Sequence, residues 1–242
     1  MSAPIADVAA RGPSLDEHAD AVRDMFGRIA PTYDLLNRVL SGGFDVAWRQ
    51  AAVNALADAP RGPSLDLCAG TLDLTVMLDR LRPYERLIAS DFSEPMLRAG
   101  ASKVSRAEIV VADAQALPFE DASIAAMVCG FGIRNVADTE KAIREARRVL
   151  MPGGVFVTLE FFRPARLPTR IFHRAFATCL LPAVGGMLSG DRDAYAYLAQ
   201  SMDGFLSRDE YVRAVKQAGF LPVTAKDLTL GVASIVRAEV PL

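Results

Sequence analysis

Short apolar runs alternate with amphipathic stretches through the middle of the chain, and this alternation is the strongest constraint on its fold. The apolar runs lie at 64–68, 86–91, 109–111, 124–129 and 155–160. Most of them are separated by stretches whose apolar residues recur every three or four positions, as in helices, at 74–81, 94–104 and 139–150. Strands that alternate with helices of this length predict βαβ units, and therefore an α/β protein with a doubly wound, mostly parallel sheet.

The two ends of the chain add helices and two more strands. Three helical stretches precede the first strand, at 15–30, 33–40 and 46–57. After the fifth strand the sequence predicts a helical insertion near 162–204 and a helix at 208–218. Strands at 221–230 and 233–240 would then close the sheet as an antiparallel pair. We therefore expect a seven-stranded sheet in a single domain spanning residues 1–242, with a loose tail at 1–15.

Composition narrows the class of protein. Hydrophobic residues make up 51% and charged residues 23% of the 242 residues, which suits a folded domain with a full core. A formal net charge of -2 argues against a nucleic-acid-binding protein, because such proteins are usually basic. The three cysteines lack metal-ligand spacing, and the apolar stretch 171–188 contains His173, Arg174 and Pro182. Neither a metal site nor a transmembrane helix is therefore expected, and a cytoplasmic protein is the simplest interpretation.

Residues at the predicted strand ends point to a nucleotide-type ligand, because ligands of open parallel sheets bind beyond the carboxyl ends of the strands. Gly70 follows the first strand in a turn that a ligand can approach closely. Asp91 ends the second strand, where a carboxylate can accept hydrogen bonds from two ribose hydroxyls, and Asp113 follows the third. Each residue also has an ordinary explanation, as a turn glycine, a helix cap or a solvated acid. The lack of a G-x-G-x-x-G pattern argues against a dinucleotide oxidoreductase.

Four longer motifs make the sequence more specific. They are Tyr-Asp-Leu-Leu-Asn at 33–37, Leu-Asp-Leu-Cys-Ala-Gly-Thr at 65–71, Phe-Gly-Ile-Arg-Asn-Val at 131–136 and Arg-Val-Leu-Met-Pro-Gly-Gly at 148–154. Together they resemble the menaquinone and ubiquinone biosynthesis C-methyltransferase family, over roughly residues 22–237. The resemblance implies a class I methyltransferase fold, S-adenosylmethionine as methyl donor with S-adenosylhomocysteine as product, and a lipophilic quinol or phenol as acceptor.

The resemblance also implies roles for individual residues. At the cofactor it places Gly70, Thr71, Asp91, Asp113, Ala114 and Gly130. At the acceptor it places Arg134, Asn135 and Tyr33, where Arg134 would stabilise a phenolate, since arginine is too weak an acid to serve as a base. The alternatives are a salt bridge for Arg134 and a core position for Tyr33. The stretch 171–188 is expected to line a hydrophobic pocket, to contact a membrane surface, or to pack inside the protein or against a second copy in a homodimer.

Several positions depart from the family pattern. Leu72 stands where the family has glycine, and its branched side chain would clash with the cofactor or with the backbone geometry of the loop. Gly130 replaces a serine that helps to hold the cofactor, while Asp45 replaces histidine and Phe162 replaces serine, two changes that would reshape the acceptor pocket. The departures leave two other functions open. One is an enzyme with another acceptor or a non-methylating reaction, and the other is a non-catalytic binding protein.

Overall fold

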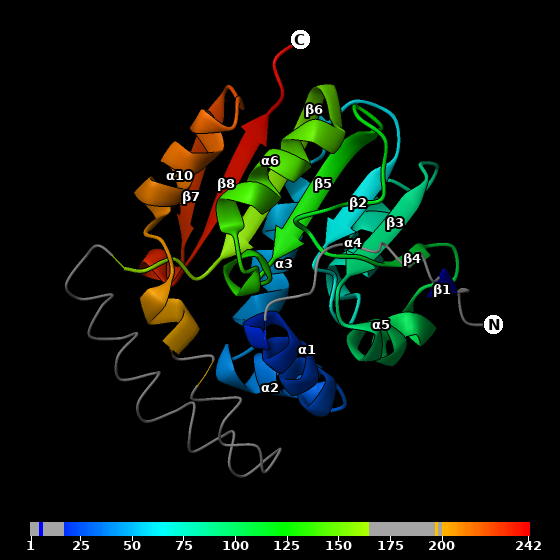
Figure 1. Ribbon diagram of the computed structural model, residues 1–242, viewed down its shortest axis with the longest axis vertical. Coiled ribbons are helices and arrows are strands. Elements are labelled where there is room, and N and C mark those ends of the chain that lie inside the picture. Colours follow the sequence, from blue (N-terminus) through cyan, green and yellow to red (C-terminus); the bar gives the residue numbers. More distant parts are fainter. Residues whose placement is uncertain (1–4, 7–16, 165–196, 198–199) are drawn as a thin grey trace.

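The computed structural model describes residues 5–6, 17–164, 197 and 200–242, and its centre is one eight-stranded sheet. The strands follow the order β1-β4-β3-β2-β5-β6-β8-β7 (Figure 1). Their bounds are β1 Ile5–Ala6, β2 Ser64–Leu67, β3 Leu87–Asp91, β4 Glu108–Val111, β5 Ile124–Gly130, β6 Leu150–Glu160, β7 Val223–Leu228 and β8 Ala233–Glu239. The strand order reverses between β2 and β5, and such a reversal opens a crevice at the carboxyl ends of the strands.

The pairing of the strands confirms the predicted topology. The first six strands of the sheet, from β1 to β6, pair in parallel with one another, whereas β8 lies antiparallel to both β6 and β7. The seven predicted strands are thus present, with an antiparallel pair at the closing edge. The two-residue strand Ile5–Ala6 forms the other edge against Ile109–Val110, within the segment for which a loose tail was predicted.

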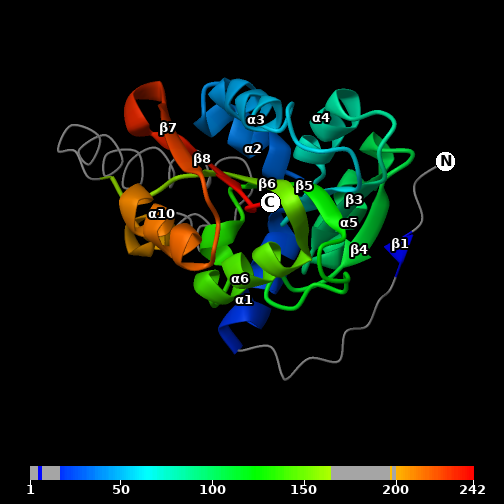
Figure 2. The same ribbon diagram turned by 90° about the horizontal axis from the view of Figure 1, so that it is seen from above.

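Helices cover both faces of the sheet, as expected for parallel strands that are buried on both sides (Figures 1 and 2). One face carries α3 (Phe44–Asn54), α4 (Asp73–Leu81) and α5 (Glu94–Gly100), and the other carries α6 (Thr139–Val149) and α10 (Arg208–Gln217). Two further helices, α1 (Glu17–Ile29) and α2 (Tyr33–Leu40), lie beyond the carboxyl ends of the parallel strands (Figure 1). Short 3-10 turns complete the fold, at η1 (Ala101–Lys103), η2 (Ile133–Asn135) and η4 (Thr229–Gly231).

Local sequence explains where several helices begin. The side chain of Asp138 accepts a hydrogen bond from the backbone N–H of Lys141 at 2.8 Å and so caps α6. A capping box between Ser207 and Glu210 begins α10.

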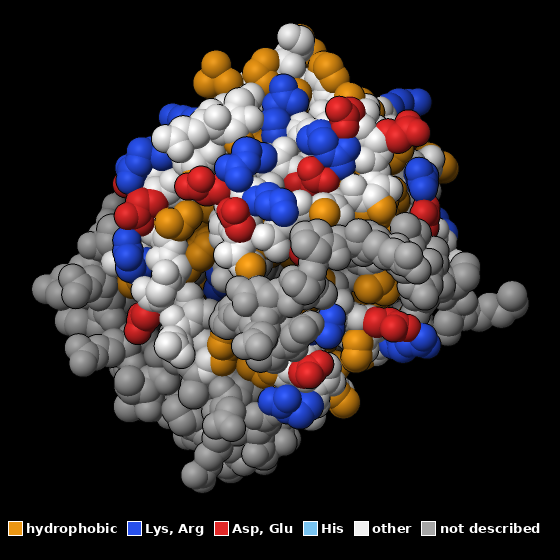
Figure 3. Space-filling view, viewed as in Figure 1, with side chains coloured by type: hydrophobic (Ala, Val, Ile, Leu, Met, Phe, Trp, Pro, Cys, Tyr) orange, Lys and Arg blue, Asp and Glu red, His pale blue; other side chains and the backbone are white. Residues whose placement is uncertain are grey.

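Charged side chains of both signs alternate over the face that carries α6 and α10 (Figure 3), where Arg148 lies 2.6 Å from both Asp121 and Glu145.

The buried apolar residues form three clusters. Two of them fill the space between the sheet and the helices on its two faces. The third joins α1 and α2 to Met96 of α5 and to Met202, at the end of the sheet where the parallel strands terminate. Among the described helices, none is both long and apolar enough to cross a bilayer. Most of the predicted insertion at 162–204, including the stretch 171–188, lies outside the described residues.

Candidate functional site

A pocket opens where β2, β3, β4 and β5 end, beneath α1 and α2. Its wall combines carboxylates, backbone at glycines and apolar side chains. The lining residues are Phe26, Tyr33, Leu67, Cys68, Gly70, Asp91, Phe92, Met96, Ala112, Asp113, Ala114, Gln115, Gly130, Phe131, Gly132, Asn135, Val136 and Ala137. Of the nine residues assigned to the site in the sequence analysis, the pocket brings together seven. Thr71 and Arg134 lie beside it and do not line it.

Asp91 is fixed at the end of β3 by two backbone donors. Its Oδ2 accepts the N–H of Gly70 at 2.9 Å, and its Oδ1 accepts the N–H of Ser93 at 2.8 Å. Burial raises the pKa of Asp91 to about 6, although the hydrogen bonds oppose this shift. The carboxylate therefore joins the turn at Gly70 to β3, and it keeps lone pairs for further donors from the pocket.

Asp66, in the neighbouring strand β2, is also buried and also has a raised pKa. Desolvation is the main cause, the negative charge of Asp91 adds to it, and the pKa reaches about 7. The hydroxyl of Thr75 donates to Asp66 Oδ2 at 2.6 Å, whereas Oδ1 has no hydrogen-bond partner within the described structure. Two carboxyl groups with raised pKa values thus lie at the floor of the pocket and behind it.

The end of β4, next to β3, contributes a polar turn to the pocket wall. Asp113 Oδ1 accepts the backbone N–H of Gln115 at 2.8 Å, and the side-chain amide of Gln115 donates to both carboxylate oxygens of Asp113 at 3.1 Å. Ala114 lies between them, and Phe92 and Met96 add apolar surface to the pocket wall. A flat, partly polar ring system fits such a mixture of small, apolar and hydrogen-bonding groups.

Glycines at the end of β5 allow close packing around the pocket. A Cβ on Gly130 would lie 2.4 Å from Leu74 Cδ1, and a Cβ on Gly132 would lie 2.3 Å from Cys68 Cβ. Phe131 between them has φ +58°, and its ring stacks on Phe161 with centroids 4.5 Å apart. At Gly130, where a serine was expected from the family pattern, the packing of Leu74 accounts for the missing side chain.

Arg134 forms a buried ion pair. Its Nη1 lies 2.7 Å from Glu160 Oε1, with 3% of the arginine side chain and none of the glutamate side chain exposed. The same Nη1 donates to the carbonyl of Phe131 at 2.7 Å, and Nε donates to Ser201 Oγ at 3.3 Å. Glu160 also accepts the backbone N–H of Phe161 at 2.8 Å. The geometry is that of the salt-bridge alternative, with the arginine holding the turn η2.

Asn135 and Tyr33 both line the pocket, Asn135 from the turn η2 and Tyr33 from α2. Asn135 Oδ1 accepts the hydroxyl of Tyr197 at 3.3 Å, and its amide donates to the carbonyl of Phe131 at 3.4 Å. Tyr33 begins α2, and its ring packs edge-on against Phe26 with centroids 6.1 Å apart. Burial raises the pKa of Tyr197. These residues supply amide and phenol groups to an otherwise apolar part of the wall.

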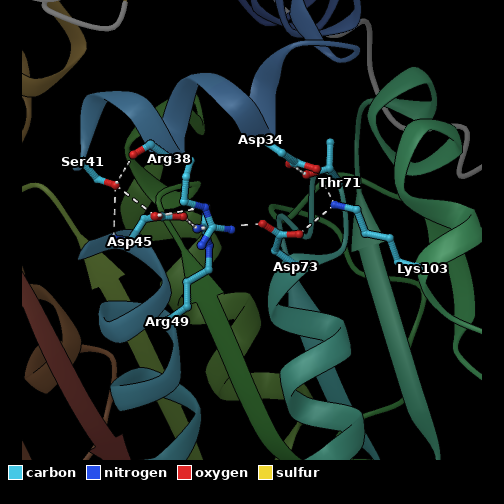
Figure 4. Close-up of polar contacts among 8 residues, drawn as sticks. All are labelled: Asp34, Arg38, Ser41, Asp45, Arg49, Thr71, Asp73 and Lys103. Atoms are coloured by element: carbon cyan, nitrogen blue, oxygen red, sulfur yellow. Dashed lines mark hydrogen bonds and ion pairs between the residues drawn. The ribbon is translucent and has the colours of Figure 1, made fainter. Parts of the chain in front are cut away.

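Thr71 and Leu72 turn their side chains away from the pocket. The hydroxyl of Thr71 donates to Asp34 Oδ1 in a short hydrogen bond (Figure 4). Leu72 precedes α4 with φ 68° and ψ 19°, in the left-handed region, and its side chain is completely buried in the cluster beneath α3 and α4. The side chain of Leu72 does not line the pocket, contrary to the expected clash with the cofactor, whereas its left-handed backbone agrees with the expected conflict with the loop geometry.

The remaining departures also lie away from the pocket wall. Asp45 is buried on α3, where it accepts the hydroxyl of Ser41 at 2.9 Å and pairs with Arg49 (Figure 4). Phe162 packs in the opposite cluster against Phe205 and Tyr211, with centroids 5.8 and 5.1 Å apart. Neither side chain lines the pocket, so the substitutions change packing and charge around it.

Six pocket residues were not predicted from the sequence: Phe26, Phe92, Met96, Ala112, Gln115 and Ala137. Phe92, Met96 and Gln115 each lie within five residues of an assigned aspartate or alanine at a strand end, so proximity to Asp91 and Ala114 was the available signal. Phe26 gave no such signal, because α1 reaches the pocket only through tertiary packing. The pocket residues fit an adenosine-type cofactor. Asp91 would receive the ribose hydroxyls, the wall at Phe92 and Ala114 would hold the base, and the backbone at Gly70 and Gly130 would border its aliphatic part.

Comparison with known proteins identifies the family. Residues 14–239 match the model of the ubiE/COQ5 methyltransferase family. The demethylmenaquinone methyltransferase of Thermus thermophilus is 43% identical over 222 residues, which are 90% of this chain and 100% of the relative. The ubiquinone/menaquinone biosynthesis C-methyltransferase UbiE of Syntrophotalea carbinolica is 39% identical over 217 residues, 88% of this chain and 91% of the relative.

A solved structure supports the fold independently. A SAM-dependent methyltransferase from Thermotoga maritima superimposes with a TM-score of 0.66 at 19% identity, covering 89% of this chain and 98% of the other. At that identity the likeness shows the fold alone. The family match spans nearly the whole chain, and the relatives are aligned over almost their full length. The chain therefore belongs to the ubiE/COQ5 methyltransferase family and is a methyltransferase that depends on S-adenosylmethionine.

Proposed function

We propose that this protein methylates a ring carbon of a prenylated quinol of the demethylmenaquinol type. The names of the two relatives, demethylmenaquinone methyltransferase and ubiquinone/menaquinone biosynthesis C-methyltransferase, support the substrate class. The observation that carries the proposal is the pocket itself. Its lining includes the Asp91 carboxylate, which suits a nucleoside, together with the Tyr33 and Asn135 side chains, which suit an aromatic ring that carries hydroxyls.

We further propose that the S-adenosylmethionine lies along the ends of β2 to β5. The carboxylate of Asp91, oriented by the N–H groups of Gly70 and Ser93, would accept the ribose hydroxyls. Asp113 and Ala114 would border the base, and Gly130 would let the methionine part pass close to β5. When bound, the cofactor supplies an activated methyl group on a sulfonium, so the protein mainly aligns the two reactants.

The acceptor side of the proposed mechanism requires a nucleophilic ring carbon. A quinol carbon becomes nucleophilic when the ring hydroxyl loses its proton. Tyr33 and Asn135 lie where they can hydrogen-bond such a hydroxyl, and Asn135 is oriented by Tyr197. Arg134, whose charge is balanced by Glu160, would act indirectly, by holding the turn η2 that carries Asn135.

A prenylated acceptor also requires contact with a lipid phase. Three apolar side chains on α2 and at the start of α3 are about half exposed: Leu35 at 55%, Val39 at 47% and Phe44 at 54%. Phe44 stacks on Trp48, which packs against Phe131 of the pocket wall. We propose that this side of the molecule approaches the bilayer, and co-sedimentation with phospholipid vesicles would measure the contact. A Phe44→Ser variant that sediments as well as the native protein would contradict it.

The decisive experiment supplies donor and acceptor together. Purified protein is incubated with S-adenosylmethionine and a short-chain demethylmenaquinol kept reduced, and the product is identified by mass spectrometry. The proposal expects a product heavier by one methylene and an equal amount of S-adenosylhomocysteine. The oxidised quinone, whose ring carbon is not nucleophilic, should give no product. Tight binding of S-adenosylhomocysteine without methylation of naphthoquinols or benzoquinols would overturn the proposed acceptor.

A further inference from the structure

Two neighbouring residues of α2, Tyr33 and Asp34, point their side chains in different directions. Tyr33 lines the pocket, whereas Asp34 points to the turn after β2 (Figure 4). Asp34 Oδ1 accepts the hydroxyl of Thr71, and Asp34 Oδ2 accepts the ammonium group of Lys103. The same ammonium group donates to Asp73 Oδ1 at 2.7 Å. One carboxylate of α2 is thus bound to the cofactor turn directly and, through Lys103, to the first residue of α4.

The two contacts of Asp34 differ in their exposure to solvent, and therefore in their strength. Thr71 is 4% exposed, and its hydroxyl has Asp34 as a charged acceptor, so this bond is partly shielded from water. The side chains of Lys103 and Asp34 are 28% and 39% exposed, so solvent screens their ion pair. The bond from Thr71 to Asp34 is therefore the stronger constraint, and Lys103 orients Asp34 from the solvent side.

The turn that Asp34 holds is the one that carries Gly70. Gly70 donates its N–H to Asp91, and a shift of Thr71 would move that donor and with it the orientation of the Asp91 carboxylate. The turn packs closely against α5, which limits a shift in that direction. The approach is close enough that a Cβ built on Gly100 would lie 2.3 Å from the carbonyl oxygen of Thr71. The turn is thus bounded by α5 on one side and tied to α2 on the other.

We propose that Asp34 is a positioning residue for the cofactor site, acting through Thr71, and that Lys103 holds it in place. The bond couples the two halves of the pocket, because the same turn of α2 carries Tyr33 to the acceptor side. This inference rests on the proposed cofactor site, although it concerns residues outside the pocket lining.

A double-mutant cycle tests the proposal by calorimetric titration with S-adenosylhomocysteine. Thr71→Val removes the hydroxyl at nearly constant volume, and Asp34→Ala removes its acceptor. Each single change should weaken S-adenosylhomocysteine binding by about tenfold, as expected for a hydrogen bond to a charged group. The double variant should bind about as weakly as either single variant, because both changes break the same bond. Arg98→Met, which breaks only the exposed pair with Glu94 on α5, is the matched control.

Three readouts separate positioning from general loss of structure. The circular dichroism spectrum of each variant should match that of the native chain at the temperature of the titration. Asp34→Asn keeps an acceptor for Thr71 and should recover most of the affinity, and Lys103→Met should lower it by about threefold with a weaker dependence on salt. Additive losses in the double variant, or native affinity in folded Asp34→Ala, would overturn the inference. Native protein that fails to bind S-adenosylhomocysteine would instead overturn the proposed cofactor site.

Discussion

Leu72 occupies a backbone conformation that favours glycine, yet we predict that Leu72→Gly destabilises the protein. At φ 68° a leucine carries about 1–2 kcal/mol of strain, which glycine would relieve. The side chain is completely buried, and truncation of a buried leucine costs about 2–5 kcal/mol. Glycine also gains about 0.4–1 kcal/mol of chain entropy in the unfolded state. The net loss in the free energy of unfolding should therefore be about 2–3 kcal/mol.

The comparison with alanine makes this prediction sharp. Leu72→Ala leaves a similar cavity and keeps the strain, so it should be less stable than Leu72→Gly by about 1 kcal/mol. At Leu78, which is equally buried but inside helix α4, the order should reverse, because glycine is the poorer residue in a helix interior by about 1 kcal/mol. Guanidinium denaturation followed through the single tryptophan, Trp48, measures all four variants. A Leu72→Gly variant as stable as the native chain would refute the packing argument, and a more stable Leu72→Ala variant would refute the strain argument.

The remaining predictions concern the pocket and the residues around it. Because the pKa of Asp91 is about 6, S-adenosylhomocysteine should bind about tenfold more tightly at pH 7 than at pH 5, and Asp91→Asn should flatten that dependence. The folding stability of the ligand-free protein should depend on pH in the opposite sense. The stability contributed by the raised pKa of Asp91 is present below about pH 4 and is lost as the pH rises through about 6. Chemical denaturation at pH 4 and pH 7 would measure this loss, and Asp91→Asn should reduce it. Glu160→Gln should lower the free energy of unfolding by about 3 kcal/mol, and Arg134→Met in the same chain should restore part of it, whereas equal stability of all three proteins would contradict a structural ion pair. Gly100→Ala should weaken S-adenosylhomocysteine binding by more than tenfold, because a Cβ 2.3 Å from a carbonyl oxygen of the cofactor turn forces the turn to move, and unchanged affinity would show that the turn is free to shift.

The sequence predicted the sheet well because its strands are buried on both faces. Such strands appear as short apolar runs, and the residues that follow them lie together at one edge. Asp91 and Asp113 could therefore be assigned to one pocket from their positions after two such runs. The two-residue strand Ile5–Ala6 is too short to show any period, and it was not predicted.

Side-chain direction is what the sequence could not provide. Thr71 and Arg134 were assigned to the ligand, but each is bonded to a carboxylate far along the chain, Asp34 and Glu160, at separations of 37 and 26 residues. Leu72 presented the converse problem. Its left-handed φ rotates the side chain into the core, and this rotation depends on the turn between β2 and α4, which residue types alone do not reveal.

The separate apolar cluster of α1 and α2 has a kinetic consequence. This cluster is smaller than the two on the sheet, so we expect the amide protons of α1 and α2 to exchange with solvent at a lower free energy than those of β2 and β5. Phe26 and Tyr33 lie at this cluster and also line the pocket, so its local unfolding would change the pocket wall. We therefore expect a mutation that tightens the cluster to raise the melting temperature and to slow the exchange of ligand at this wall.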